Sequence, residues 1–136
     1  MSIRIRDIDH VVLRVRDLPR ALAFYCGVLG CTVERELKER GLVQLRAGSA
    51  MIDLVTVDSD LGRQGGAGPG MEGRNLDHFC VRVEPFDASA ILTILRNHGY
   101  SPGEPARRYG AEGYGPSIYV QDPDGNTVEL KGPPED

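Results

Sequence analysis

Long apolar runs are missing from this 136-residue sequence. No stretch approaches the roughly 20 residues that a helix needs to cross a bilayer. The first ten residues, MSIRIRDIDH, contain no apolar core of a secretory signal. The three cysteines form no C-x-x-C pair, and their odd number argues against a disulfide framework. We therefore expect a cytoplasmic protein with reduced thiols.

An excess of positive charge is also absent, because the formal net charge is −4. Nucleic acids and anionic membranes attract basic surfaces, so neither is an expected partner. The apolar fraction of 40% is ordinary for a globular protein, and the length fits a single domain.

What the sequence does contain is a strand followed by a helix. IDHVVLRV, residues 8–15, is rich in branched apolar residues and reads as a strand. Asp17 can cap the following helix, Pro19 fits its first turn, and Gly30 can end it. Three further strands are expected at residues 32–38, 42–46 and 50–57.

The second half of the chain repeats this pattern. LDHFCVRV at residues 76–83 matches IDHVVLRV, and the pair His10 and His78 shows the constant offset of 68 residues. A helix is expected within residues 84–99, and strands near residues 101–107, 117–121 and 126–131. The turn DPDG at residues 122–125 indicates a hairpin between the last two strands.

The repeat predicts an α+β fold of two β-α-β-β-β modules. We expect module one at residues 5–57, a linker at residues 58–74 and module two at residues 75–131. Together they would form one domain, with a curved, eight-stranded mixed sheet around a shared cavity. The glycine-rich linker could also close over that cavity as a lid, and we favour the linker role.

Strand alternation indicates which side chains face the cavity. Val11, Leu13 and Val15 are uniformly apolar and should face the helix, so His10 should point the other way. His78 follows by the repeat. In the last strand of each module a carboxylate stands between apolar neighbours, and these carboxylates are Asp53 and Glu129.

Two imidazoles and two carboxylates suit one divalent metal of borderline character, such as Fe, Mn, Co, Ni or Zn. A magnesium or calcium site would use oxygen ligands only. The alternative is that the four residues are unrelated surface or hydrogen-bonded groups, and their repetition weighs against it. His98 lies at the C-terminal end of a helix, where the helix dipole favours a cation. This structural role is sufficient to explain the histidine, so we do not count it among the metal ligands.

Five further residues share the cavity-facing parity of their strands. The arginines could neutralise the carboxylates, bind an anionic substrate or reach solvent, and the others could line the pocket or contact substrate. These candidates for substrate binding are Arg14, Gln44, Arg82, Ser117 and Tyr119.

Three segments carry a family resemblance: IDHVVLRVRDLPRALAFYCGVLG, LDHFCVRV and SIYVQDPDGNTVELKG. They resemble the vicinal oxygen chelate superfamily, which includes glyoxalase I, extradiol dioxygenases, methylmalonyl-CoA epimerase, and fosfomycin and bleomycin resistance proteins. The chain is most similar to its small glyoxalase-domain members. The resemblance implies that His10, His78 and Glu129 are metal ligands, and that the protein is a homodimer in which the ligands come either from one chain or from two. In the glyoxalase branch a Glu or Gln completes the set, whereas this sequence has the shorter Asp53.

Three functions follow from this resemblance. The first is an isomerase or lyase whose small substrate chelates the metal through vicinal oxygens, with Glu129 or Asp53 as the catalytic base. The second is a non-haem Fe(II) dioxygenase of extradiol type, in which Tyr119 or Tyr114 could help to move protons. The third is a small-molecule binding or resistance protein, which predicts an apolar, metal-free cavity that the four titratable residues contradict.

Overall fold

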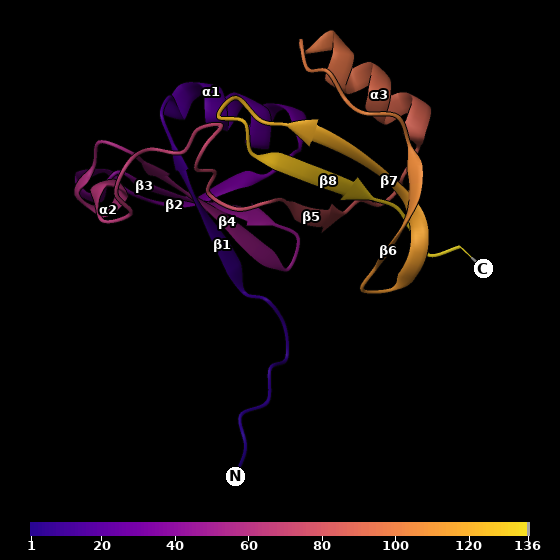
Figure 1. Ribbon diagram of the computed structural model, residues 1–136, viewed down its shortest axis with the longest axis horizontal. Coiled ribbons are helices and arrows are strands. Elements are labelled where there is room, and N and C mark those ends of the chain that lie inside the picture. The colour runs from indigo at the N-terminus through magenta and orange to yellow at the C-terminus, as the bar shows by residue number, and fades with distance from the viewer. Residues whose placement is uncertain (136) are drawn as a thin grey trace. The chain divides into compact units, whose positions relative to one another are not determined.

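The computed structural model describes residues 1–135 and divides into two compact units, Met1–Pro69 and a second that begins at Gly70 (Figure 1). Each unit holds one of the predicted modules. The boundary between the units falls inside the segment expected to be a linker. Among the described residues, no helix has the length and apolar character needed to cross a membrane.

The first unit is built on a four-stranded mixed sheet. Its strands are β1 (His10–Val15), β2 (Thr32–Leu37), β3 (Leu42–Ala47) and β4 (Ala50–Thr56), in the spatial order β1-β4-β3-β2. β1 and β4 are parallel, and the other pairs are antiparallel. Its helical segments are α1 (Leu18–Leu22), the π-helix η1 (Ala23–Val28), the 3-10 helix η2 (Lys38–Arg40) and α2 (Asp60–Arg63).

Local signals explain the helix of the first unit. The Asp17 side chain accepts a hydrogen bond from the Arg20 backbone N–H at 3.1 Å, as the capping pattern predicts. Gly30 follows the helix with φ of +80°, a conformation that favours glycine. The helix buries Phe24 and Tyr25, whose rings meet edge to face at 4.9 Å. The buried strand residues of this unit's core include Leu13, Val15, Leu45, Ile52 and Leu54.

The second unit repeats the topology of the first. Its strands are β5 (Phe79–Arg82), β6 (Ala106–Gly110), β7 (Gly113–Gln121) and β8 (Thr127–Lys131), in the order β5-β8-β7-β6. β5 and β8 are parallel, and the other pairs are antiparallel. The helix α3 (Ala88–Asn97) is capped by Asp87. The α+β class and the two β-α-β-β-β modules are thereby confirmed, with the eight strands arranged as two sheets of four.

Several boundaries differ from expectation, and the strand expected at residues 117–121 is β7, which already begins at Gly113. The strand expected near residues 101–107 is β6, which starts only at Ala106, because Pro102 and Pro105 cannot donate to a sheet ladder. The histidines lie at strand ends: His10 is the first residue of β1, and His78 comes just before β5. The segment 58–74 contains the short helix α2, where a loop was expected.

The DPDG turn is held by a buried polar network. One oxygen of Asp122 accepts hydrogen bonds from the backbone N–H groups of Asp124 and Asn126, both at 2.8 Å. The side chain of Asn126 donates to the other oxygen at 2.8 Å and accepts from Asn75 at 3.0 Å. The turn therefore anchors the segment that leads into His78.

Candidate functional site

In the first unit the sheet register brings a carboxylate and an imidazole to the same face. Asp53 on β4 pairs with Val12 on β1 and with Gln44 on β3. Because side chains alternate along a strand, His10 and Arg14 share the face of Val12 and Asp53. Gln44 faces the same way. The predicted cavity-facing residues of module one therefore lie on one face of its sheet.

Asp53 is the buried group of that face, with 3% of its surface exposed. Its Oδ2 atom accepts a hydrogen bond from Gln44 Nε2 at 3.1 Å. Its Oδ1 atom is buried and has no hydrogen-bond partner within residues 1–135. An unsatisfied buried carboxylate oxygen is costly. The atom is therefore suited to a ligand that the protein chain does not itself supply.

His10 is oriented by the residue before it. Its Nδ1 atom lies 2.7 Å from Oδ1 of Asp9. This hydrogen bond raises the pKa of His10 above its usual value of 6.5, with a smaller increase from the Asp53 charge and partial opposition from burial. Because Nδ1 is bonded to Asp9, Nε2 is the ring nitrogen left to bind another group.

The second unit repeats this arrangement. Nδ1 of His78 lies 2.6 Å from Oδ1 of Asp77, and Nε2 of His78 lies 3.5 Å from Oε1 of Glu129. Glu129 on β8 is only 6% exposed. Each unit thus contains an Asp–His pair and a buried carboxylate, and in the second unit the imidazole and the carboxylate face each other.

Two further candidates lie on β7, where Tyr119 pairs with Glu129 and Ser117 pairs with Lys131. The ring of Tyr119 meets that of His78 edge to face at 5.5 Å, and its β7 position pairs with Glu129. Burial, together with the Glu129 charge, raises the pKa of Tyr119, while the nearby Arg108 lowers it. Arg108 lies 4.2 Å from the Tyr119 ring centre and donates to the Ser117 side chain at 2.6 Å. The part of Ser117 and Tyr119 in substrate binding stays a prediction.

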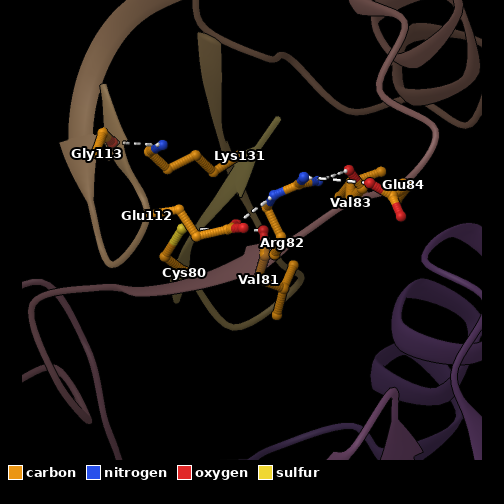
Figure 2. A network of polar contacts seen from close by, with 8 residues as sticks. All are labelled: Cys80, Val81, Arg82, Val83, Glu84, Glu112, Gly113 and Lys131. Atoms are coloured by element: carbon orange, nitrogen blue, oxygen red, sulfur yellow. Dashed lines mark hydrogen bonds and ion pairs between the residues drawn. The ribbon is translucent and has the colours of Figure 1, made fainter. Parts of the chain in front are cut away.

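The two arginines of the repeat hold nearby segments of the chain. Arg14 donates to the backbone carbonyls of Gly62 and Gly66, at 3.4 and 3.1 Å. Arg82 donates to Glu112 at 2.7 Å, to Glu84 at 3.2 Å and to the backbone carbonyl of Val83 at 2.7 Å (Figure 2). Much of the hydrogen-bonding capacity of Arg82 is therefore used by its own unit.

A pocket of about 300 Å³ opens on this face of the second unit. Its lining joins three of the expected residues, His78, Arg82 and Glu129, with residues that sequence reasoning did not single out. The full lining is His78, Cys80, Arg82, Tyr109, Gly110, Ala111, Glu112, Glu129 and Lys131. Strand alternation could have identified two of these additional residues. Cys80 lies two residues from both His78 and Arg82, and Lys131 lies two residues after Glu129, so each shares a face with the expected residues.

The Cys80 thiol is held in its neutral form. Desolvation raises its pKa to about 11, with a further increase from the Glu129 charge and a partial decrease from Lys131. A thiol is nucleophilic as the thiolate. Cys80 therefore lines the pocket as a weakly reactive group.

The donor atoms fit a divalent metal of the expected kind, since each unit offers one imidazole nitrogen and one buried carboxylate. A carboxylate bonded to the other ring nitrogen is the usual support of a metal-binding histidine. Asp9 and Asp77 match this role, and the repeated Asp-His dipeptide was its sequence signal. Residues 1–135 contain no group of three or more His, Cys, Asp or Glu side chains close enough together to enclose an ion.

Known proteins are similar to this chain in sequence and fold. Residues 7–130 match the Glyoxalase/Bleomycin resistance protein/Dioxygenase superfamily. The chain is 26% identical over 124 residues to a catechol-2,3-dioxygenase of Bacillus subtilis, covering 90% of this chain but only 40% of that protein. It is 30% identical to the glyoxalase domain-containing protein RDO1 of Mycosarcoma maydis, over 95% of this chain and 69% of that one.

A solved structure from the mobile metagenome of V. pseudocholerae superposes with a TM-score of 0.78. It is 27% identical and covers 99% of this chain and 100% of its own. The superfamily match extends over nearly the whole chain and agrees with the paired modules described above. The chain therefore belongs to the glyoxalase/bleomycin resistance protein/dioxygenase superfamily, whose members commonly use a divalent metal.

Proposed function

We propose that the protein is a divalent-metal-dependent enzyme of isomerase or lyase type that acts on a small molecule with two adjacent oxygen atoms. The observation that carries this proposal is the repeated unit of an Asp–His pair and a buried carboxylate on one sheet face. A fold alone does not require this combination, whereas a histidine oriented by a carboxylate, next to a second carboxylate, is typical of a metal site.

The proposed ligands are Nε2 of His10 and His78 together with the carboxylates of Asp53 and Glu129. Asp9 and Asp77 would fix the ring orientation and the tautomer of the two histidines through the bonds at Nδ1. The unsatisfied Oδ1 of Asp53 supports its inclusion, because a ligand bond would remove the cost of burying that atom.

The remaining chemistry belongs to the protein's own side chains. A divalent ion, when bound, stabilises negative charge on the substrate oxygens as a Lewis acid. Gln44 fixes Asp53 by a hydrogen bond, whereas Glu129 lies against His78 and Tyr119. We therefore assign to Glu129 the removal of a proton from the carbon next to a substrate carbonyl, and to Asp53 a holding role.

A second candidate function is supported by one of the relatives. The chain resembles a catechol-2,3-dioxygenase over 90% of its length, although it spans 40% of that protein. His10, His78 and Glu129 would then form the two-histidine, one-carboxylate set of non-haem Fe(II) oxygenases. Iron in the purified protein, combined with oxygen uptake on a panel of catechols, would select this candidate over the isomerase or lyase.

Metal content per chain tests the proposed site directly. We expect about one divalent ion per chain in the wild type, and nearly complete loss in both His10→Ala and His78→Ala. His98→Ala is the matched control, because Nδ1 of His98 donates to the backbone carbonyl of Ile94 at 2.9 Å at a helix end, and this variant should keep its ion. If each of the first two variants retained half the metal, the units would bind separate ions and the shared-ion proposal would fail.

A further inference from the structure

Lys131, the last residue of β8, is a buried cation of the second unit. Only 5% of its surface is exposed, and its Nζ atom donates to the backbone carbonyl of Gly113 at 3.1 Å. An ammonium group has three donors, and buried charges in proteins are normally paired. Within residues 1–135 Lys131 forms no ion pair, so both its charge and most of its hydrogen-bonding capacity are unused.

The other cations near this pocket are engaged. Arg82 is paired with Glu112 and Glu84, and Arg108 is bonded to Ser117. Figure 2 shows the difference: the Arg82 guanidinium reaches Val83 and Glu84, whereas the Lys131 side chain extends to Gly113 alone. Lys131 is therefore the cation of this pocket that has charge available for a ligand.

Gly110 makes room for the lysine. A Cβ atom at Gly110 on β6 would lie 2.8 Å from Cε and 3.0 Å from Cδ of Lys131. At Gly115 on β7, a Cβ atom would lie 2.5 Å from the backbone oxygen of Pro133 and 3.1 Å from Nζ of Lys131. Contacts this short require a neighbour to move. The lysine side chain thus runs across backbone that carries no side chains, which fixes its path along the pocket.

The first unit provides an internal comparison. Lys131 pairs with Arg82 in the β5–β8 register, and Val55 pairs with Arg14 in the corresponding β1–β4 register. Val55 is buried and apolar. The same position in the same topology is therefore filled by a valine in one copy and by a lysine in the other. The fold does not need a cation there, so its presence points to a ligand.

We propose that Lys131 is the anion-binding subsite of the pocket, and that the substrate carries a carboxylate or phosphate group in addition to its adjacent oxygens. This inference rests on the proposed function for the role of Glu129. Residues two apart on a strand are about 7 Å apart and face the same way. The anionic group of the substrate would thus lie about 7 Å from Glu129, the proposed base. This distance fits a small organic acid or a phosphate ester.

The chain offers an unusually clear probe, because Lys38 and Lys131 are its two lysines. With 13C-labelled lysine, metal-free protein gives two Cε signals, which Lys38→Arg assigns. Titration with acetate, and separately with inorganic phosphate, should move the Lys131 signal saturably and leave Lys38 unmoved. Acetamide and sodium chloride at equal ionic strength should move neither. A response to acetate alone indicates a carboxylate substrate, and a response to phosphate alone a phosphate ester.

Absence of a saturable Lys131 shift with either anion would overturn the inference, as would equal shifts of both lysines. In Lys131→Gln we expect the anion affinity to fall at least about tenfold. This affinity is measured from the backbone amide shifts of the pocket residues. Lys131→Val, which copies the first unit, is the second variant if the glutamine disturbs folding. Both should keep the wild-type metal content. If the wild-type protein bound no divalent metal but showed the expected anion response, the proposed function would be contradicted and the Lys131 subsite would stand.

Discussion

Nε2 of His78 and Oε1 of Glu129 lie 3.5 Å apart, although His78 comes just before β5, Glu129 is the middle residue of β8, and the two are far apart in the sequence. This separation is too long for a strong hydrogen bond. Two ligand atoms that each lie about 2.1 Å from a tetrahedral ion are themselves about 3.4 Å apart. The spacing of the pair is therefore compatible with the two ligand atoms of the proposed metal site.

Glu129→Gln should separate this role from simple burial. Glutamine keeps the size of the side chain but lacks the charge and the basicity, so we expect metal affinity to fall at least about tenfold. Proton removal should be abolished. Glu104→Gln is the matched control, because Glu104 is highly exposed and makes only a 4.0 Å contact with Arg96. Wild-type metal affinity in Glu129→Gln would contradict the ligand role, as measured by competition with a chromogenic chelator.

The Asp9–His10 bond predicts a pH dependence. Since the pKa of His10 is raised above 6.5, protonated His10 stabilises the folded state below that pH, and this contribution is lost as pH rises through the folded-state pKa. Protons compete with a metal for the same ring. Asp9→Asn should therefore lower the His10 midpoint in an NMR titration, and move the onset of metal binding to lower pH.

Asp9→Asn should also weaken metal binding at high pH by about 10- to 100-fold, because the ring loses its orienting carboxylate. Asp7→Asn is the control, since Asp7 lies two residues before Asp9 and pairs with its exposed neighbour Arg6. An unchanged His10 midpoint in Asp9→Asn would show that the 2.7 Å contact does not govern the titration.

Asp53→Asn should have opposite effects on stability and on metal binding. In the presence of a chelator, the buried Oδ1 has no partner within residues 1–135, so replacing the carboxylate by a neutral amide should stabilise the fold by about 1 kcal/mol. Metal affinity should fall, because an amide is a weaker ligand than a carboxylate. Urea unfolding with and without metal measures both. A variant less stable than wild type in chelator would show that Asp53 serves the fold itself.

Cys80 should be accessible but slow to react. Its thiol is exposed and has a pKa of about 11, so few molecules carry the thiolate at pH 8.5. In a Cys26→Ser/Cys31→Ser background, we expect alkylation by iodoacetamide about a hundredfold slower than that of free glutathione. A rate equal to that of glutathione would contradict the raised pKa.

Sequence periodicity was sufficient to predict the order of the elements in both modules and the residues that share a sheet face, but not the order of the strands within each sheet. His10 recurs at His78, and Asp53 and Glu129 are single acids between apolar neighbours. Strand alternation predicts from these positions that the histidine and the carboxylate of each module share one face of its sheet. The observed registers agree with this reasoning. The shared cavity and the joint metal site stay predictions.

Other features depend on side-chain paths that a linear pattern does not encode. Lys131 was missed because a lysine at a strand end is normally exposed, and only the glycines of neighbouring strands let it lie buried. The Arg82–Glu112 pair joins residues that are 30 apart in the sequence, and Glu112 lies in the β6–β7 hairpin. The sequence pattern placed the first strand of this hairpin too early, because Pro102 and Pro105 delay its start to Ala106.

The close approach of Lys131 to Gly110 has an evolutionary consequence. The two positions cannot vary independently, because a Cβ atom at Gly110 would lie 2.8 Å from Cε and 3.0 Å from Cδ of the lysine stem. Among relatives of this chain, a glycine at position 110 should accompany a long side chain at position 131, and relatives with a short residue at position 131 should be free to carry a larger residue at position 110. Under the anion-binding role proposed for Lys131, a change of substrate charge would therefore require coordinated substitutions in two strands.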